Sequence, residues 1–277
     1  MRRAMAAALA VLVIASGARA QAPARFRWRT GQVLVYRIEQ SMLASEVVGD
    51  TRAEDRTRHT ATQRWQVLAV DPAGVATLQL SNQALLYEAT RANGDVLRFD
   101  SANLDKSTPQ LREQFSRYVG QPLAVLRVDG FGRVVEVKES KFGSAGRFEV
   151  EPPFVGLLPP DGLKPGQAWE RSYPITLGPP HGTGEKYVAV QRYVCKGVTN
   201  GRAAIGLTTE MKTQPEAAGD RVPLLEMQPE GEMVFDLQAG RLHSAAMRVD
   251  KELKGHDGEG SSYHFQSTYT VQYAGDH

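Results

Sequence analysis

The sequence predicts a mainly β protein in which two similar antiparallel halves form a curved sheet or a barrel-like domain. Three observations predict this class. Apolar and polar residues alternate with a period of two over much of the chain, which is typical of half-buried strands. Turn-forming Gly, Asn, Asp and Pro residues separate these stretches. Nearly the same hairpin also occurs twice, as QRWQVLAVDPAGVATLQL at 63–80 and as QRYVCKGVTNGRAAIGL at 191–207.

The size and composition fit a folded domain of this kind. A chain of 277 residues is long enough for one large β domain or two small ones. Its contents of 42% hydrophobic and 23% charged residues are those of a globular protein and argue against a disordered one.

The first twenty residues predict a secretory signal peptide. Arg2 and Arg3 form a basic start, residues 4–17 are an apolar run too short to span a bilayer comfortably, and Ala18-Arg19-Ala20 is a small-x-small cleavage site. A retained N-terminal anchor is the alternative. We expect cleavage before Gln21, and therefore an exported protein, periplasmic or extracellular, with no further transmembrane segment.

Cleavage also changes the charge of the protein. The predicted peptide carries Arg2, Arg3 and Arg19 and no acidic residue, so its removal takes the formal charge from +2 to −1. A mature chain of that charge has no net attraction to nucleic acid or to an anionic membrane. We therefore expect no nucleic-acid partner.

The repeat extends beyond the hairpin and divides the chain. Gly31-Gln32-Val33-Leu34 opens the first half, as Gly166-Gln167-Ala168-Trp169 opens the second. A closing hairpin with Asp and Gly in its turn follows in each half, at Val128–Val134 and at Phe235–Leu242. Three elements in the same order indicate an internal duplication, although shared β patterning alone could produce part of this likeness. The divisions are a first β half (21–141), a Pro-rich packed crossover (142–165) and a second β half (166–277). One barrel and two sheets both remain open as arrangements of the halves.

Two features of the first half make specific predictions. Val33–Val47 is a long strand, and the return segment Thr51–Thr62 is so polar that we expect it to project into solvent or lie at a sheet edge. Further on, Asn93-Gly94 predicts a hairpin with a type I′ turn.

Residues 108–119 predict one main helix, which we expect to cover the sheet. Ser107 or Thr108 can cap it, Pro109 suits its first turn, and Gly120 can end it. Its apolar face has helical spacing and consists of Leu111, Phe115, Tyr118 and Val119. In the second half the equivalent segment, Pro215–Pro229, is broken by Pro and Gly.

The segment between the halves is expected to pack rather than to hang free. Its five prolines forbid a regular helix or a central strand. It is too apolar for a flexible linker, since it contains Phe154, Val155, Leu157 and Leu158. Later strands are expected to begin near Tyr187, Arg202, Met233, Arg241 and Tyr263.

The end of this segment carries a family resemblance. Leu157-Leu158-Pro159-Pro160, followed by Leu163-Lys164-Pro165-Gly166-Gln167-Ala168-Trp169, resembles a bacterial family of exported, lipoprotein-like proteins of unknown function. Phe235-Asp236 with Gly240-Arg241-Leu242 is similar to the closing hairpin of that family. The resemblance implies no activity and no site residues. Many relatives look like lipoproteins, whereas this chain has Gln21, not Cys, at the first mature position.

No catalytic, cofactor-binding or metal-binding residues can be assigned from the sequence. Cys195 is the only cysteine, so no intramolecular disulfide can form, and its alignment with Val67 favours a small buried residue over a reactive thiol. His256–Glu259 could offer oxygen atoms to Ca²⁺, but a Gly-rich hairpin loop is the simpler interpretation. Gly143-Ser144 and Gly260–Ser262 are interpreted as turns rather than nucleophile sites. Core positions are expected for Trp65 and Trp169.

These observations favour an exported non-enzymatic binding protein of the cell envelope for an apolar or lipid-like ligand. The basis is a large β architecture with a covering helix and no catalytic set, and half-barrel lipoprotein carriers offer a fold-level analogy. A structural or protein-interaction module, whose edge strands bind a partner strand, is the alternative. A hydrolase is the least favoured class.

Overall fold

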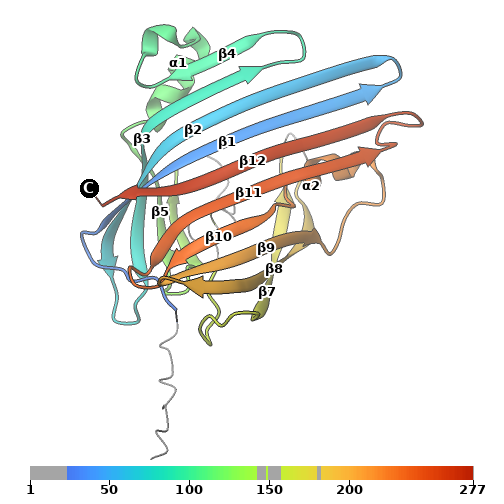
Figure 1. The fold of residues 1–277 in the computed structure, drawn as a ribbon. Helices are drawn as coiled ribbons and strands as arrows, with labels where there is room; N and C mark the ends of the chain where they lie inside the picture. Colours follow the sequence, from blue (N-terminus) through green and yellow to red (C-terminus); the bar gives the residue numbers. More distant parts are fainter. Residues whose placement is uncertain (1–23, 142–147, 149–156, 180–181, 277) are drawn as a thin grey trace, which may run out of the picture.

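The computed structural model describes residues 24–141, 148, 157–179 and 182–276. The prediction of a mainly β fold is confirmed: in these residues one antiparallel sheet of twelve strands is present, curved and not closed into a barrel (Figure 1). The strands of the first half are β1 (Val33–Val48), β2 (Thr51–Val70), β3 (Ala76–Thr90), β4 (Val96–Asp100), β5 (Pro122–Val128) and β6 (Val134–Ser140). Those of the second half are β7 (Ala168–Leu177), β8 (Glu185–Thr199), β9 (Arg202–Met211), β10 (Glu230–Asp236), β11 (Arg241–Lys254) and β12 (Ser262–Gly275).

The two halves follow each other within this sheet. The strand order is β6-β5-β3-β2-β1-β12-β11-β10-β9-β8-β7, and β4 pairs with the outer part of β3. The first half thus has the order β1-β2-β3-β5-β6, and the second has the matching order β7-β8-β9-β10-β11. Strand β12 is additional and joins the halves, because it pairs with β11 on one side and with β1 on the other.

The openings of the two halves have the same hydrogen-bond pattern. The N–H of Gly31 donates to the carbonyl of Val67 at 2.9 Å, and the N–H of Gly166 donates to that of Cys195 at 2.8 Å. In return, the backbone N–H of Val67 donates to the carbonyl of Gln32, and the backbone N–H of Cys195 donates to the carbonyl of Gln167. Val67 and Cys195 therefore occupy equivalent positions in the two halves, as the alignment of the repeats predicted.

The segment Ala24–Trp28, which we term the N-terminal clasp, connects the closing hairpins of both halves. The N–H of Phe26 donates to Gly130 at 2.7 Å, and the N–H of the next residue, Arg27, donates to Gly240 at 2.9 Å. The Phe26 ring stacks on Trp28, with centroids 5.0 Å apart, and meets Phe235 edge-on at 4.9 Å. The clasp thus ties the first half to the second.

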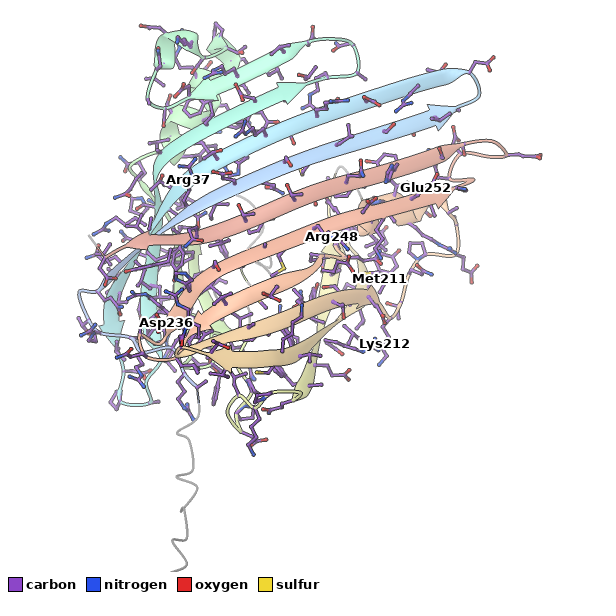
Figure 2. All side chains as sticks on the ribbon, in the orientation of Figure 1. Arg37, Met211, Lys212, Asp236, Arg248 and Glu252 are labelled. Atoms are coloured by element: carbon purple, nitrogen blue, oxygen red, sulfur yellow. The ribbon has the colours of Figure 1, made fainter. Side chains whose placement is uncertain are left out.

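A single main core lies on the inner face of the sheet and receives side chains from both halves. Alternating residues of the matched strands β3 and β9 are buried there: Ala76, Leu78, Leu80, Ala203, Ile205 and Leu207. Trp65 is buried as expected, while Trp169 is only partly buried at the margin of this core. The opposite face is polar, and Figure 2 labels exposed members of its rows on β1 and β11: Arg37, Arg248 and Glu252.

The crossover contributes to the core where the structure describes it. Phe148, Leu157 and Leu158 are buried in the main cluster. Phe154 and Val155 lie outside the described residues, as do the predicted signal peptide and Gly143-Ser144.

The predicted helix is shorter than expected. Helix α1 spans Pro109–Phe115, and a 3₁₀ turn, Ser116–Tyr118, follows it. Neither expected cap is present, because Ser107 and Thr108 accept hydrogen bonds from the N–H groups of Asp100 and Arg98 on β4 instead. The apolar face is confirmed: Leu111 is buried, and the other members of the face pack against the core.

Two further predictions are corrected in part. The hairpin at Asn93-Gly94 forms, but only Gly94 has a positive φ (86°), so its turn is not type I′. The two-residue turn with positive φ at both positions is Asn200-Gly201. Thr51–Thr62 is not an edge over most of its length, because β2 pairs with β3 from Arg56 onward and with β1 on its other side.

The segment 215–229 of the second half also contains a short helix. Helix α2 (Val222–Leu225) follows a 3₁₀ turn at Gly219–Arg221 and lies beside β11 (Figure 1). Its Leu224 is buried against a small separate cluster formed by β7 and β8, with Tyr173, Ile175, Leu177 and Ala189.

Candidate ligand-binding cleft

The floor of a cleft is formed by neighbouring side chains on the inner face of β1, β2 and β3. Strand pairing places Gln40 opposite His59, and His59 opposite Tyr87. The period of two along each strand, together with a bulge in β3, brings the other floor residues to the same face: Met42, Thr57, Gln63, Asn82 and Leu85.

A β-bulge in β3 explains why both Asn82 and Leu85 belong to this floor. The register with β2 shifts between Thr62 and Gln63, so that Gln63 pairs with Asn82 while Thr62 pairs with Ala84. The extra residue reverses the alternation, and side chains on both sides of the bulge therefore reach the same face.

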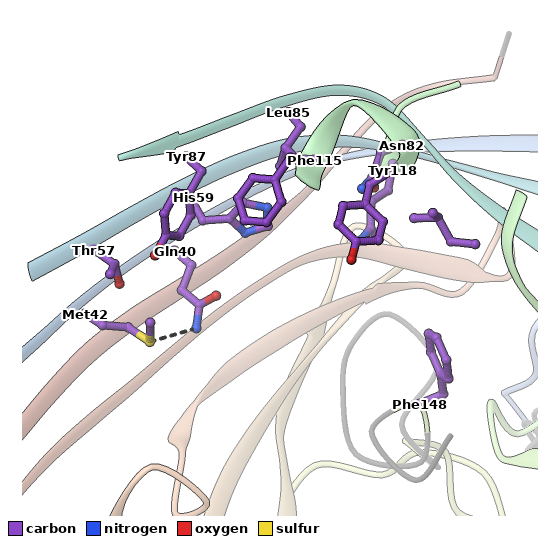
Figure 3. A pocket seen from close by; sticks show the side chains of 12 residues that line it. Gln40, Met42, Thr57, His59, Asn82, Leu85, Tyr87, Phe115, Tyr118 and Phe148 are labelled. Atoms are coloured by element: carbon purple, nitrogen blue, oxygen red, sulfur yellow. Dashed lines mark hydrogen bonds between the residues drawn. The ribbon is translucent and has the colours of Figure 1, made fainter. Parts of the chain in front are cut away.

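The walls come from the helical segment, from β5 and from the crossover. Figure 3 shows Phe115 and Tyr118 beside the floor residues, and Leu123 and Phe148 complete the lining. The Phe115 ring meets Tyr87 edge-on, with centroids 5.4 Å apart, and lies 5.8 Å from the Tyr118 ring. The cleft is partly open and has a volume of about 390 Å³.

Two polar atoms of the lining are buried without a partner. Asn82 is only 9% exposed, and its Oδ1 has no hydrogen bond within the described part of the chain. The same holds for Oγ1 of Thr57 on β2. Buried polar atoms without a partner are uncommon because they lose the hydrogen bonds that water would give them. Neither atom has accessible surface, so a molecule in the cleft would reach it only if the side chain moved.

The lining offers little for catalysis. Among the twelve lining residues that the structure describes, no Lys, Arg, Asp or Glu is present. General acid–base chemistry needs a positioned donor and acceptor pair of suitable pKa. The described residues also contain no group of three His, Cys, Asp or Glu side chains that could hold a metal ion.

Cys195, which the sequence left between two interpretations, is a buried core residue. Its side chain is fully buried, and burial raises the pKa of the thiol. The low-pKa setting of a reactive cysteine is therefore not present here.

The remaining candidates of the sequence analysis lie outside the cleft. In the loop of His256–Glu259, Nε2 of His256 lies 2.8 Å from Oε1 of Glu46, so this histidine binds the end of β1. Ser261 is buried in the same turn, where its hydroxyl donates to the carbonyl of Gly258. Nucleophilic chemistry has no support at that serine.

Sequence reasoning assigned no site residue, and the cleft was therefore missed. The available signal was a run of polar residues on the inner side of otherwise apolar strands, at Gln40, Thr57, His59 and Gln63. Alternation alone does not show this, because an inner polar position and an outer one look the same until the register is known.

Comparison with known proteins gives no identity. No family model matches the chain, and no curated protein matches it. Among solved structures, DynF from the dynemicin biosynthesis pathway of Micromonospora chersina is similar over 94% of this chain and 88% of its own, at 8% identity and a TM-score of 0.23. The MucA/MucB complex of Pseudomonas aeruginosa is similar over 86% of this chain and 89% of the other, at 10% identity and a TM-score of 0.15. Neither TM-score supports a functional argument.

None of the helices in the described part of the chain is both long and apolar enough to cross a bilayer.

Proposed function

We propose that the protein is an exported, non-enzymatic binding protein of the cell envelope that holds a small apolar ligand in the cleft. The observation that carries this proposal is the cleft of about 390 Å³, in which seven of the twelve described lining residues are aromatic or aliphatic. Small-molecule sites are typically concave, mostly apolar cavities of roughly 300–1,000 Å³ with a few convergent polar groups.

The shape of the sheet supports a carrier for a physical reason. An open, curved sheet has an inner face that must be covered, and here the core covers most of it. Among the described residues, α1, its 3₁₀ turn and Phe148 cover the outer ends of β1–β3, and Leu225 of α2 packs near Met42 of β1. A cavity remains where those elements stop short of the floor.

The alternatives receive less support. The interaction module was inferred from the polar segment Thr51–Thr62 and from other edge strands. Only Thr51–Asp55 of that segment extends beyond the pairing with β3, while β6 and β7 are the edges of the described sheet. A hydrolase would need a carboxylate or a nucleophile with its base in the cleft, and no carboxylate is among the lining residues that the structure describes.

Native mass spectrometry on protein purified from the periplasm without detergent tests the proposal. We expect an extra mass that organic solvent releases and that is a small apolar molecule. Gln40→Trp, which fills the cleft from β1, should lose this mass. Gln79→Trp, on the outward row of β3, should keep it and serves as the matched control. A bare mass that does not change when envelope lipids are added would favour the interaction module.

A further inference from the structure

Cationic and aromatic residues alternate in the N-terminal clasp and directly after it, in the order Arg25-Phe26-Arg27-Trp28-Arg29. Phe26 is buried and Trp28 is partly buried against the main core, whereas the three arginines are exposed. Such alternation is typical of an extended segment, whose successive side chains point to opposite sides. This segment therefore presents three guanidinium groups to solvent.

The closing hairpin of the first half adds a fourth exposed arginine. The guanidinium group of Arg25 lies over the Phe131 ring, 4.2 Å from its centroid. Arg133 belongs to the turn of the same hairpin, where its backbone N–H donates to Oδ1 of Asp129. Because the Phe131 ring is only partly buried, an aromatic ring and two arginines lie together at the surface here.

The closing hairpin of the second half adds a fifth. Nη1 of Arg27 donates to the carbonyl of Gln238 in that turn at 3.1 Å. The exposed Arg202 begins β9 and pairs with Asp236 of β10, which Figure 2 labels at the same end of the sheet. We term these five residues the basic end: Arg25, Arg27, Arg29, Arg133 and Arg202.

Most acidic residues near the basic end are neutralised by other cations. Within the described part of the chain, none of the five arginines forms an ion pair. Asp71 and Asp276 each pair with an arginine outside this set. The crossover turn, which bonds to the first closing hairpin, has one exposed charge of each sign, Asp161 and Lys164.

Asp129 and Asp236 oppose the basic end only in part. Both are partly buried, and their carboxylates accept hydrogen bonds from N–H groups of their own turns. Two acidic side chains of the hairpin turns thus stand against five exposed guanidinium groups.

The remaining charges of the chain have little effect at this end. Strand β1 has 16 residues, so the opposite end of the sheet lies roughly 50 Å away at about 3.3 Å per residue. Charges separated by more than a Debye length, about 10 Å at 0.1 M salt, are largely screened. A surface that touches the basic end therefore meets its arginines rather than the formal charge of −1 expected for the whole mature chain.

We propose that the basic end binds the surface of a phospholipid bilayer that contains anionic head groups. Arginine suits phosphate oxygens, and aromatic rings such as those of Trp28 and Phe131 are favoured where head groups meet acyl chains. The predicted signal peptide precedes Ala24, so on the expectation of export this end adjoins the membrane before cleavage. The surface is separate from the cleft, and the proposal does not depend on the ligand of the cleft.

Co-sedimentation of the full mature chain with lipid vesicles tests the proposal. We expect binding to vesicles of phosphatidylcholine mixed with phosphatidylglycerol, and none to vesicles of phosphatidylcholine alone. Binding should be lost near 1 M salt, where the Debye length falls to about 3 Å. Equal binding to both kinds of vesicle, or to neither, would overturn the proposal.

Two sets of variants locate the surface. An arginine near an anionic leaflet strengthens binding by roughly fivefold, so Arg25→Gln, Arg27→Gln and Arg29→Gln together should weaken it by about a hundredfold. The corresponding lysine variants keep the charge and should retain most of the binding. If the glutamine variant does not fold, Arg133→Gln with Arg202→Gln, outside the clasp, should weaken binding by about twentyfold.

The matched control removes the same charge from another part of the fold. Arg52→Gln, Arg56→Gln and Arg58→Gln lie on the outward row of β2, toward the other end of the sheet, and should leave vesicle binding unchanged. Equal weakening in this control would overturn the assignment to the basic end. A DNA duplex that binds more tightly than the vesicles at the same salt would overturn the lipid partner. Because native mass spectrometry reports on the cleft and sedimentation on the basic end, either proposal can fail without the other.

Discussion

The side-chain hydroxyl of Tyr36 donates a hydrogen bond to the backbone carbonyl of Leu242 at 3.1 Å, across 206 residues of sequence. Tyr36 belongs to β1 and Leu242 to β11, and β12 lies between these strands. The Tyr36 ring also meets Tyr273 of β12 edge-on, with centroids 5.7 Å apart. This buried contact therefore fixes the junction of the two halves, and burial raises the pKa of the Tyr36 hydroxyl far above its ordinary value.

Tyr36→Phe should lower the free energy of unfolding by about 1–3 kcal/mol, because it leaves the buried Leu242 carbonyl without this donor. Urea unfolding measures the change. Tyr187→Phe, at a partly buried tyrosine of β8, is the control and should cost less. Equal costs would show that the hydroxyl of Tyr36 contributes nothing specific.

Alkaline pH should destabilise the fold through its buried tyrosines. Desolvation raises the pKa of Tyr173 from 10.0 to about 12. The unfolded chain ionises near 10 and the folded chain only near 12, so stability is complete below about pH 10 and falls as the pH rises toward 12. The loss from this group is at most about 1.4 kcal/mol per pH unit.

Tyr173→Phe removes the ionising group and keeps the ring in its cluster with Ile175 and Leu177. Thermal melts between about pH 8 and pH 12 should therefore show a shallower alkaline decline in the variant. Parallel declines in both proteins would contradict the assignment of the slope to Tyr173.

Because Gly132 contacts the N-terminal clasp and Gly74 does not, we expect replacement by alanine to cost more stability at Gly132 than at Gly74. Gly132 has a φ of 88°, and an added Cβ would lie 2.5 Å from the Phe26 ring. Gly74 has a φ of 82° with open space around it. Gly74→Ala should cost about 1–2 kcal/mol from backbone strain alone.

Gly132→Ala should cost roughly 1–3 kcal/mol more than that, because Phe26 must move away from the closing hairpin. Chemical denaturation of both variants gives the comparison. A cost no greater than that of Gly74→Ala would mean that the clasp is easily displaced.

Cys195 should be protected in the folded protein. Because its side chain is fully buried and burial raises the thiol pKa, a thiol-specific reagent should label it only after denaturation. Cys195→Val, the residue present at the matched position 67, should change stability by less than about 1.5 kcal/mol. Rapid labelling of the native protein would contradict both expectations.

Sequence alone was sufficient for the fold class and for the main strands, because alternation in residues such as Ala76, Leu78 and Leu80 directly reflects burial on one face. Sequence was insufficient where a residue forms a hydrogen bond other than the one that its local sequence pattern predicts. Threonine often caps helices, but the hydroxyl of Thr108 accepts a hydrogen bond from the backbone N–H of Arg98 on β4 instead. In the Asn93-Gly94 hairpin, Oδ1 of Asn93 accepts a hydrogen bond from the N–H of Asp95, and only Gly94 has a positive φ.

The cleft depended on information that no local pattern contains. Gln40, His59 and Tyr87 are neighbours only because of the register of three strands, and Asn82 reaches the floor only because of a bulge. Register was not predicted from the sequence, so the polar floor residues could not be recognised as a group.

The pairing of β1 with β12 has a consequence for how the protein folds. These strands pair from Val35 with Gly275 to Val47 with Ser262, so the beginning and the end of the described chain meet in the middle of the sheet. Contacts this distant in sequence have a high entropic cost of loop closure and slow the folding rate. A chain that emerges N-terminus first holds β1 with one side unpaired until its last strand arrives, and the centre of the sheet, rather than its margins, is the last part to form.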